Sequence, residues 1–258
     1  MSIYQHFRKE EHAFIDQVLS WMEMVENSYI PRLSDFLDPR QQQIVSMLIG
    51  TKQADLQAEL YGGGTYTERK RVWIAPFYDE INEDLFQLTL LQAKYTEKFV
   101  TLTHRDVLGA FLSLGLAREK LGDILVGDGL IQLIVASEIA PFIEMNLTEI
   151  KNAKITIQHK PLEDLLEKKL NWIESNQTVA SLRLDNVLKE IYRISRKDAV
   201  DFIQKQYVKV NFKLVTDPKF IIEAGDMISL RRKGRSKLVQ INDKTRKGNI
   251  HITTARLE

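Results

Sequence analysis

The sequence predicts an α+β protein made of three parts, and two observations carry that prediction. Segments with the three- and four-residue apolar spacing of helices are interspersed with segments in which apolar and polar residues alternate, as they do in strands. Charge is also divided along the chain: the net charge is +1, yet Ser181 to Glu258 holds 18 Lys and Arg against 9 Asp and Glu, whereas the other 180 residues hold 18 against 26. The expected boundaries are 1–81 for a helix-and-hairpin part, 82–160 for a middle domain, 161–177 for a linker helix and 178–258 for a basic module.

The N-terminal part is expected to contain two helices and a β-hairpin. Apolar residues recur at helical spacing from Phe14 to Val25. The segment Asp38 to Gly50 has an N-cap residue, a proline in the first turn and a glycine at its end, which predicts a second helix. Leu56 to Leu60 and Arg71 to Phe77 are strand-like, and the glycines at 62–64 predict a turn between them.

The middle domain is expected to have the order β-α-β-β-α-β, which is that of the ferredoxin-like fold. Its predicted elements are, in order, Phe86 to Tyr95, Thr103 to Leu116, Gly122 to Val126, Leu130 to Val135, Ser137 to Leu147 and Lys154 to His159. RNA-recognition motifs (RRMs) share this topology, but they stack bases on aromatic residues of their central strands. The candidate central strands here offer only Phe86 and Tyr95. This RRM-like topology therefore does not by itself predict RNA binding.

A charged helix, Glu163 to Trp172, is expected to link the middle domain to the basic module. The module should contain two short helices followed by a small sheet. Its helices are predicted at Leu184 to Ile191 and from Ser195 onward, and its strands at Val208 to Phe212 and Met227 to Leu230. Five cations then follow within the seven residues 231–237.

The helix starts of the module predict a phosphate-binding face. Arg196 and Lys197 fall in the first turn of the second helix, where the helix dipole disfavours cations. Their presence is explained if an anion occupies this end, where free backbone N–H groups also point. Arg183 lies at the start of the preceding helix, and Lys209 and Lys213 project from the adjoining strand. We expect these five residues to form one face; the alternative is an ordinary solvated surface, the usual fate of Lys and Arg.

Four short blocks in this module resemble the S-four RNA-binding domain, named for the fourth small-subunit ribosomal protein. The blocks are Leu182-Arg183-Leu184-Asp185, Ser195-Arg196-Lys197-Asp198-Ala199, Val208-Lys209-Val210-Asn211 and Gly225-Asp226-Met227-Ile228. They follow in the family's order at close to its spacing. The resemblance implies binding to structured RNA, chiefly through the five cations of the predicted face, with Asp185 fixing the helices. One departure is Phe212, where the family has a glycine in a turn.

The whole chain also resembles the YlmH family of bacterial S-four proteins, which are encoded with cell-division genes. The residues that carry this resemblance are Pro76-Phe77-Tyr78, His104 to Gly109 and Arg118 to Ile124. It implies an acidic N-terminal part, a ferredoxin-like middle and a C-terminal RNA-binding domain. It further implies ribosomal RNA or tRNA as the ligand and a ribosomal subunit as the expected partner.

The candidate site residues all serve RNA binding. In the module they are Arg183, Ser195, Arg196, Lys197, Lys209, Asn211, Lys213, Arg231, Arg232, Lys233 and Arg235. A second RNA contact is expected in the middle domain at Arg105, Arg118 and Lys120. No catalytic residue, metal site or cofactor is predicted, because the chain has no cysteine and its five histidines lack the spacing of metal ligands.

The leading hypothesis is a noncatalytic, cytoplasmic RNA-binding protein. The first eleven residues are polar and charged, and the longest apolar run, Leu130 to Ala136, is too short to cross a bilayer. A membrane partner is therefore not expected.

Two alternatives stay open. The first is an RNA-modifying enzyme of methyltransferase or pseudouridine synthase type, with its active site in residues 1–160. A methyltransferase would need a glycine-rich loop after a strand to hold its cofactor, but the glycines at 62–64 join two strands instead of opening a helix. Pseudouridine synthases use an Asp in a motif that resembles Arg183-Leu184-Asp185, but this synthase-like triplet lies inside the module. The second is a scaffold whose acidic N-terminal part binds a protein partner while the module tethers it to RNA.

Overall fold

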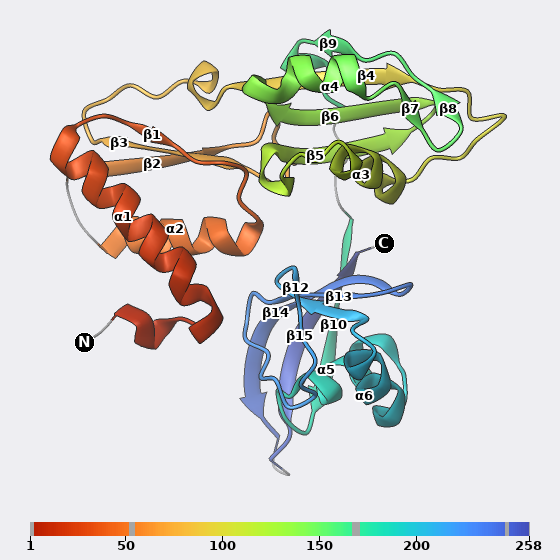
Figure 1. The fold of residues 1–258 in the computed structure, drawn as a ribbon. Helices are drawn as coiled ribbons and strands as arrows, with labels where there is room; N and C mark the ends of the chain where they lie inside the picture. The colour runs from red at the N-terminus through yellow and green to blue at the C-terminus, as the bar shows by residue number, and fades with distance from the viewer. Residues whose placement is uncertain (1–2, 52–54, 167–170, 246–247, 258) are drawn as a thin grey trace. The chain divides into compact units, whose positions relative to one another are not determined.

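A computed structural model describes residues 3–51, 55–166, 171–245 and 248–257. The chain divides into two compact units, Met1–Lys168 and Lys169–Glu258 (Figure 1). The two parts expected at 1–81 and 82–160 therefore pack together in the first unit, and the basic module occupies the second.

The N-terminal region of the first unit packs two helices against a three-stranded sheet. The elements are the 3₁₀ turns Ile3–His6 and Lys9–Glu11, α1 (His12–Ser28), β1 (Arg32–Leu33), α2 (Pro39–Thr51), β2 (Leu56–Tyr61) and β3 (Arg71–Pro76). The sheet order is β1-β3-β2, and both pairs are antiparallel. Val18, Met22 and Val45 of the helices are buried against Val72 and Ile74 of β3. The two predicted helices and the hairpin are present, whereas β1 is too short to give a periodic signal.

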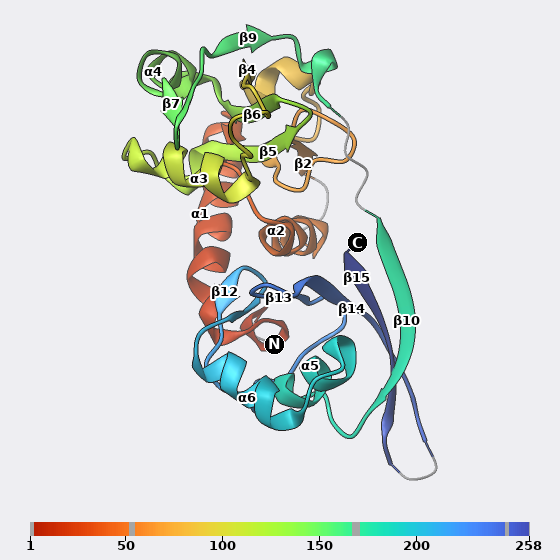
Figure 2. The same ribbon diagram turned by 90° about the vertical axis from the view of Figure 1, so that its right-hand side faces the viewer.

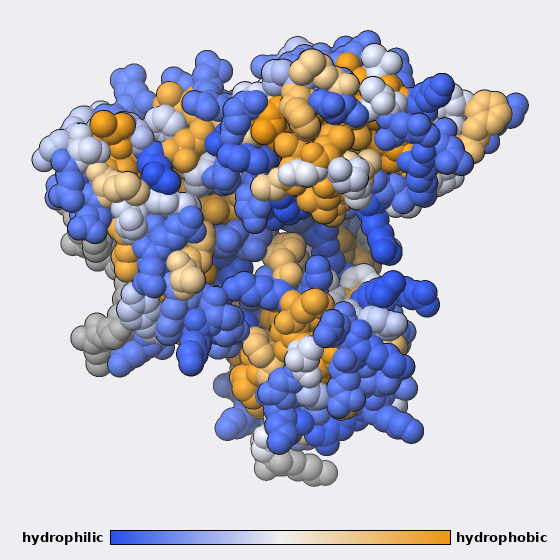
Figure 3. All heavy atoms as spheres, viewed as in Figure 1, coloured by the Kyte–Doolittle hydropathy of each residue, from blue (hydrophilic) through white to orange (hydrophobic). Residues whose placement is uncertain are grey.

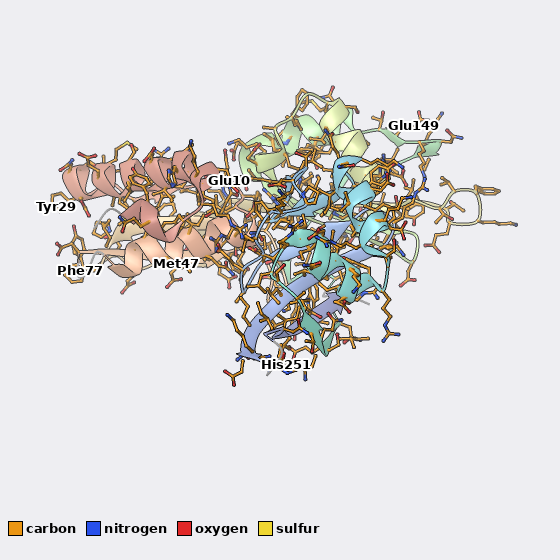
Figure 4. All side chains as sticks on the ribbon, turned by 90° about the horizontal axis from the view of Figure 1, so that it is seen from below. Glu10, Tyr29, Met47, Phe77, Glu149 and His251 are labelled. Carbon is orange, nitrogen blue, oxygen red and sulfur yellow. The ribbon has the colours of Figure 1, made fainter. Side chains whose placement is uncertain are left out.

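One end of this region exposes aromatic side chains. Phe77 follows β3 directly, and Tyr29 ends α1 in the left-handed conformation with φ 56°. Figure 4 shows both at the same end of the region, where they are 61% and 67% exposed. The Phe77 and Tyr78 rings contact each other edge to face at 5.4 Å. The Pro76-Phe77-Tyr78 signature is thus a surface feature.

The middle region of the first unit is a four-stranded antiparallel sheet of order β5-β6-β4-β9. Its elements are a 3₁₀ turn Glu83–Phe86, β4 (Leu88–Lys94), α3 (His104–Ser113), a 3₁₀ turn Arg118–Lys120, β5 (Leu121–Gly127), β6 (Leu130–Ala136), a 3₁₀ turn Ser137–Ile139, α4 (Ala140–Asn146), a small pair β7 (Glu149–Ile150) and β8 (Ala153–Lys154), and β9 (Gln158–Lys160). All six predicted elements occur in order. The last predicted strand divides between β8 and β9, because its first residues pair with β7 and its last with β4.

Both faces of this sheet are covered. Leu91 and Leu133 face α3 and α4, including buried Phe111 and Ile143. On the opposite face, Leu90 and Ile134 pack against Phe36 of the N-terminal region and against Leu162 and Leu165. The 162–166 segment, which begins with a 3₁₀ turn Leu162–Asp164, therefore lies across the face of the sheet that RRMs use.

Gln132 fixes that segment in place. Its amide is 1% exposed and donates to the backbone oxygen of Asp164 at 2.8 Å, while its oxygen accepts the N–H of Leu166 at 2.7 Å. A polar residue in the centre of the covered face is satisfied in this way by backbone groups of the segment above it.

The N-terminal and middle regions share buried contacts. The guanidinium of Arg71, a residue only 4% exposed, donates to the backbone oxygens of Ser34 at 2.7 Å and Phe86 at 3.0 Å. Phe36 packs so closely on Gly122 that a Cβ there would lie 2.6 Å from its ring. These contacts explain why residues of both regions form one compact unit.

The second unit is a six-stranded antiparallel sheet with two helices on one face. Its elements are β10 (Trp172–Val179), α5 (Leu184–Tyr192), α6 (Arg196–Gln204), β11 (Val208–Val210), β12 (Lys213–Leu214), β13 (Met227–Leu230), β14 (Gly234–Lys244) and β15 (Ile250–Leu257). The sheet order is β10-β15-β14-β13-β11-β12. Figure 2 shows the long β14–β15 hairpin with β10 beside it, extending past the helices.

The linker helix predicted at Glu163 to Trp172 is wrong. The described part of that segment holds only the 3₁₀ turn Leu162–Asp164, and Trp172 already belongs to β10; residues 167–170 lie outside the described ranges. The eight residues of β10 each pair with a residue of β15. Pairing along a whole strand outweighs the helix propensity of a charged segment, and this partner lies more than 70 residues away in the sequence.

Candidate RNA-binding interface

Two arginines meet at the helix starts of the second unit. Arg183 is the N-cap of α5 and Arg196 is the first residue of α6. The inward residues of α5, among them Leu184, Val187 and Leu188, are fully buried, and this packing sets the N-terminus of α5 beside that of α6. We call Arg183 and Arg196 the arginine pair. The sequence prediction placed both residues at helix starts, and the structure brings them together.

A single buried carboxylate holds the arginine pair. Asp185 is 1% exposed and accepts hydrogen bonds from Arg183 at 3.1 and 2.9 Å and from Arg196 at 3.1 and 3.0 Å. Burial alone would raise the pKa of Asp185, but the hydrogen bonds from both guanidinium groups outweigh it and lower that pKa below its usual value. The side chain of Arg196 is still 57% exposed. Two cations on one carboxylate leave a net positive charge whose open side faces solvent.

The start of α6 carries a local cap beside this pair. Ser195 Oγ accepts the N–H of Asp198 at 3.0 Å and donates to the Asp198 carboxylate at 2.7 Å. Ser195 thus caps the helix predicted from this residue onward, and its hydroxyl is used within the helix start. Lys197 is exposed next to Arg196. Backbone N–H groups, Arg196 and Lys197 all lie at one helix start, which suits a phosphate.

The two predicted sheet cations lie on different sides of the sheet: Lys213 pairs with Val210, which faces the helices, whereas Lys209 does not. Val208 and Val210 of β11 are buried among the helix residues, so Lys209 between them projects from the opposite face. Lys209 pairs with Ser229 of β13, which in turn pairs with Arg235 of β14. Neighbours across strands share a face. The single basic face expected from the sequence is therefore divided into two groups.

Asn211 has a structural role. Its amide is 9% exposed, donates to Asp226 at 2.7 Å and accepts the N–H of Met227 at 3.0 Å. Contact with RNA through this side chain would break those bonds, and we remove it from the proposed interface. Asn211 and Phe212 have φ values of 48° and 67° and form the two-residue turn that leads to the exposed Lys213.

The cation run 231–237 forms a turn and the start of β14. Arg231 lies over the ring of Tyr207 at 5.0 Å, and its N–H donates to the Tyr207 backbone oxygen at 2.9 Å. Arg232 and Lys233 are exposed in the turn, and Arg235 is half-buried on β14. Sequence reasoning missed Tyr207 as a functional candidate, because only the pairing of β11 with β13 makes it a neighbour of Arg231.

The second contact predicted in the middle domain is largely used internally. Lys120 Nζ lies 2.7 Å from the Asp35 carboxylate and 2.8 Å from that of Glu138. Arg118 donates to the backbone oxygens of Leu121 and Gly122, and burial, with the nearby charge of Arg69, lowers its pKa to about 10. Both side chains are engaged in these internal contacts, which disfavours the predicted RNA contact at Arg118 and Lys120.

Arg105 is the remaining candidate in the middle domain. It lies exposed in the first turn of α3, beside a capping box between Thr103 and Asp106. Asp106 also pairs with Lys151 at 2.8 Å. Arg105 is thus an exposed cation, whereas Arg118 and Lys120, with which it was expected to act, are engaged in internal contacts.

Two other kinds of site are absent from the described residues. Within residues 3–51, 55–166, 171–245 and 248–257, no group of three or more His, Asp or Glu side chains is arranged to hold a metal ion. No helix in these ranges combines the length and apolar character needed to cross a membrane. Hydrophilic residues cover most of the second unit on the side seen in Figure 3.

Three family models match the chain. A model described as YlmH, N-terminal, matches residues 10–78, and one described as a putative RNA-binding domain in YlmH matches residues 82–164. The S4 domain model matches residues 182–228, the segment in which the S-four blocks were found.

The proteins similar to this chain include two sequence relatives and one protein of solved structure. The ribosome-associated protein quality control protein P2 of Bacillus subtilis is 41% identical over 254 residues, which are 98% of each chain. Small ribosomal subunit protein uS4 of Lachnospira eligens is 33% identical over 99 residues, 36% of this chain and 50% of that protein. The structure of cell division protein ylmH from Streptococcus pneumoniae matches with a TM-score of 0.56 and 29% identity, covering 64% of this chain and 100% of that one.

Proposed function

The chain belongs to the YlmH family of S-four RNA-binding proteins, and from this premise we propose that it is a noncatalytic protein that binds structured ribosomal RNA or tRNA on the ribosome, in the cytoplasm. The observation that carries the proposal is the arginine pair on Asp185. Two guanidinium groups held by one buried carboxylate are oriented before RNA arrives, so less side-chain freedom is lost on binding.

The shape of this site favours structured RNA. The arginine pair, Lys197 and the start of α6 offer several donors to phosphate oxygens from a rigid helix pair. Such a set recognises the spacing of phosphates along a folded backbone and not the edges of bases. Ribosome association is supported by the name of the Bacillus subtilis relative, which aligns over almost the whole chain.

The noncatalytic character is supported by what the candidate catalytic groups do. Asp185, the acid of the synthase-like triplet, is buried beneath two arginines and cannot reach a base. Gly63 and Gly64 pack against Leu162 and Leu165, and a Cβ at Gly64 would lie 2.7 Å from the latter; a Cβ at Gly62 would lie 2.5 Å from the backbone oxygen of Arg69. These glycines allow close packing, which explains them without a cofactor.

We infer that the middle region is ferredoxin-like. The strand order β5-β6-β4-β9 and the antiparallel pairing support this, because they are the order and pairing of the split βαβ arrangement in the ferredoxin-like fold. Since the 162–166 segment and Phe36 cover the face opposite the helices, we place the main RNA contact in the second unit.

The arginine pair is tested by replacing both arginines with glutamine. We expect Arg183→Gln together with Arg196→Gln to weaken binding to a ribosomal RNA hairpin by about tenfold or more. The slope of log affinity against log salt concentration should also fall, by about the value of one phosphate contact for each arginine removed. Fluorescence anisotropy at several salt concentrations measures both. Lys205→Gln is the matched control, because Lys205 ends the same helix and pairs with Asp201 at 2.8 Å. An unchanged affinity and slope in the double variant would refute this interface.

The enzyme alternative requires a separate measurement. Nucleosides of ribosomal RNA and tRNA from cells with and without the protein are compared by mass spectrometry. We expect identical modification profiles, together with co-sedimentation of the protein with ribosomal subunits. A nucleoside that depends on the protein would contradict noncatalytic function.

A further inference from the structure

The second unit carries another surface, which combines the side of its sheet that faces away from the α5 and α6 core with an Arg231–Tyr207 pair at the sheet edge beside α6. We call it the outer sheet surface. Strand pairing places Trp172, Lys209, Arg235 and Lys237 on it, and Tyr207 and Arg231 adjoin them where β11 begins and β13 ends. All six are exposed or half-buried. The matched S4 segment spans residues 182–228, so four of the six lie outside it.

The strand register defines this surface. Lys209 pairs with Ser229, and Ser229 with Arg235, which gives a row across β11, β13 and β14. Trp172 on β10 pairs with Leu257 on β15. From β10 to β11 there are four spacings between strands, or roughly 19 Å at about 4.8 Å each. The surface is wide enough for an extended chain.

Cations on this surface lie against aromatic rings. Arg231 is 5.0 Å from the centre of the Tyr207 ring, and Lys237 is 4.8 Å from that of Trp172. The Tyr207 ring is in turn stacked on Phe202, at 6.3 Å and 29°. Tyr207 thus contacts both Phe202 and Arg231; the two rings are half-buried and Arg231 is exposed. The orientation of Arg231 is fixed by aromatic contacts, and no described carboxylate lies within salt-bridge distance of it.

The charge of the surface is strongly positive. The outer sheet surface holds four Lys and Arg residues. One acidic residue, Glu174, lies beside them on the same face of β10 as Trp172. A polyanion is therefore the complementary ligand. Aromatic rings and a flat guanidinium add π faces, which duplex RNA does not use because its bases are already stacked on each other.

We propose that the outer sheet surface binds an unpaired, single-stranded segment of RNA, with one base stacked on the Arg231–Tyr207 pair and phosphates on Lys209 and Arg235. This rests on the proposed function, because the same RNA would offer a folded part to the arginine pair and an unpaired part to the sheet. Arginine planes and aromatic rings are common stacking partners of unpaired bases. The protein thereby distinguishes RNA that has a junction between paired and unpaired nucleotides from a simple hairpin.

The test uses the full-length protein and two labelled probes, an unstructured oligouridine and a blunt RNA hairpin of equal length. Arg231→Lys keeps the charge but removes the planar group, and Arg231→Gln removes both. We expect both variants to bind oligouridine about five- to 150-fold more weakly, the range for loss of one stacked base, and to bind the hairpin as the parent does. Arg196→Gln is expected to give the opposite pattern.

A second measurement reports directly on Trp172. Oligouridine is expected to quench tryptophan fluorescence, and Trp172→Phe should remove that change while Trp21 and Trp73 remain. Because Arg231 is exposed, its variants should keep the fold, which hairpin binding itself confirms.

Three other results would overturn the proposal. If Arg231→Lys binds oligouridine as the parent does, charge alone acts there and the stacking proposal is overturned. If both probes weaken equally, the surface does not select unpaired RNA. A parent protein that binds the hairpin but not oligouridine overturns this inference alone, whereas binding to neither probe overturns the proposed function as well.

Discussion

Asp185 is the residue on which the geometry of the proposed RNA-binding site depends. It is buried, lies at the start of α5 and accepts hydrogen bonds from both Arg183 and Arg196. Its lowered pKa means that the folded state binds a proton less readily than the unfolded chain does. The ion triad therefore contributes to stability above the unfolded pKa of about 4, and this contribution is lost as the pH falls through the lower folded pKa.

We expect Asp185→Asn to destabilise the second unit by about 1–3 kcal/mol at neutral pH, because two guanidinium groups lose their charged partner. The difference from the parent should be constant above about pH 5 and should shrink in acid, where the parent carboxylate also becomes neutral. Urea unfolding at a series of pH values measures this. Hairpin binding should weaken too, although both arginines remain. A difference in stability that is independent of pH down to about pH 2 would contradict the assignment of this charge.

At the scale of the element, the β11–β12 hairpin breaks the rule that Asn or Gly fills both positions of a two-residue turn with positive φ. Its turn consists of Asn211 and Phe212, both with positive φ, as a type I′ turn requires. Asn tolerates this conformation, whereas Phe does so at a cost of about 1–2 kcal/mol. The glycine that the S-four family has at this position is explained by the same geometry. Here the half-buried Phe212 ring offsets part of the strain by packing.

Substitutions of Phe212 separate strain from packing. We expect Phe212→Gly to lie within about 1 kcal/mol of the parent, because relief of the positive φ offsets the lost ring. Phe212→Val should cost about 1–2 kcal/mol more than Phe212→Gly, since it loses the ring and keeps the strain. Thermal unfolding of the two variants measures this difference. Equal stabilities would show that the turn stores no strain.

At the scale of the whole molecule, the chain is two units that differ in charge and in fold. Arg71 is central to the first unit because it is buried and donates to backbone oxygens from two regions, at Ser34 and Phe86. Burial lowers the pKa of Arg71, and the carboxylates of Glu138 and Asp35 act in the opposite direction. The N-terminal and middle regions are thus expected to unfold together.

We expect Arg71→Leu to destabilise only the first unit, by about 3–5 kcal/mol, because the backbone oxygens of Ser34 and Phe86 lose their buried donor and Asp35 and Glu138 keep only Lys120 as a cation. Scanning calorimetry of the full chain should show two transitions, of which one moves to lower temperature. Hairpin RNA should raise the melting temperature of the second unit and leave that of the destabilised first unit unchanged. If Arg71→Leu shifts both transitions equally, the two units do not unfold independently.

The sequence by itself determined the features that depend on near neighbours in the chain. The helices around Val18 and Val45, the hairpin of β2 and β3, the Ser195 cap and the four S-four blocks all follow from spacing over a few residues. The charge division likewise needs only composition. These signals are local because helix periodicity and capping act within a turn or two.

Only the tertiary structure decided which cations act together. Lys209 lies away from the arginine pair because strand alternation around the buried Val208 and Val210 sends it to the other face. Lys120 was predicted to contact RNA, but its partners Asp35 and Glu138 are distant in the sequence. The linker helix gave way to β10 for the same reason. Charge and propensity belong to single residues, whereas pairing, burial and ion partners are set by segments far apart in the chain, which meet only when it folds.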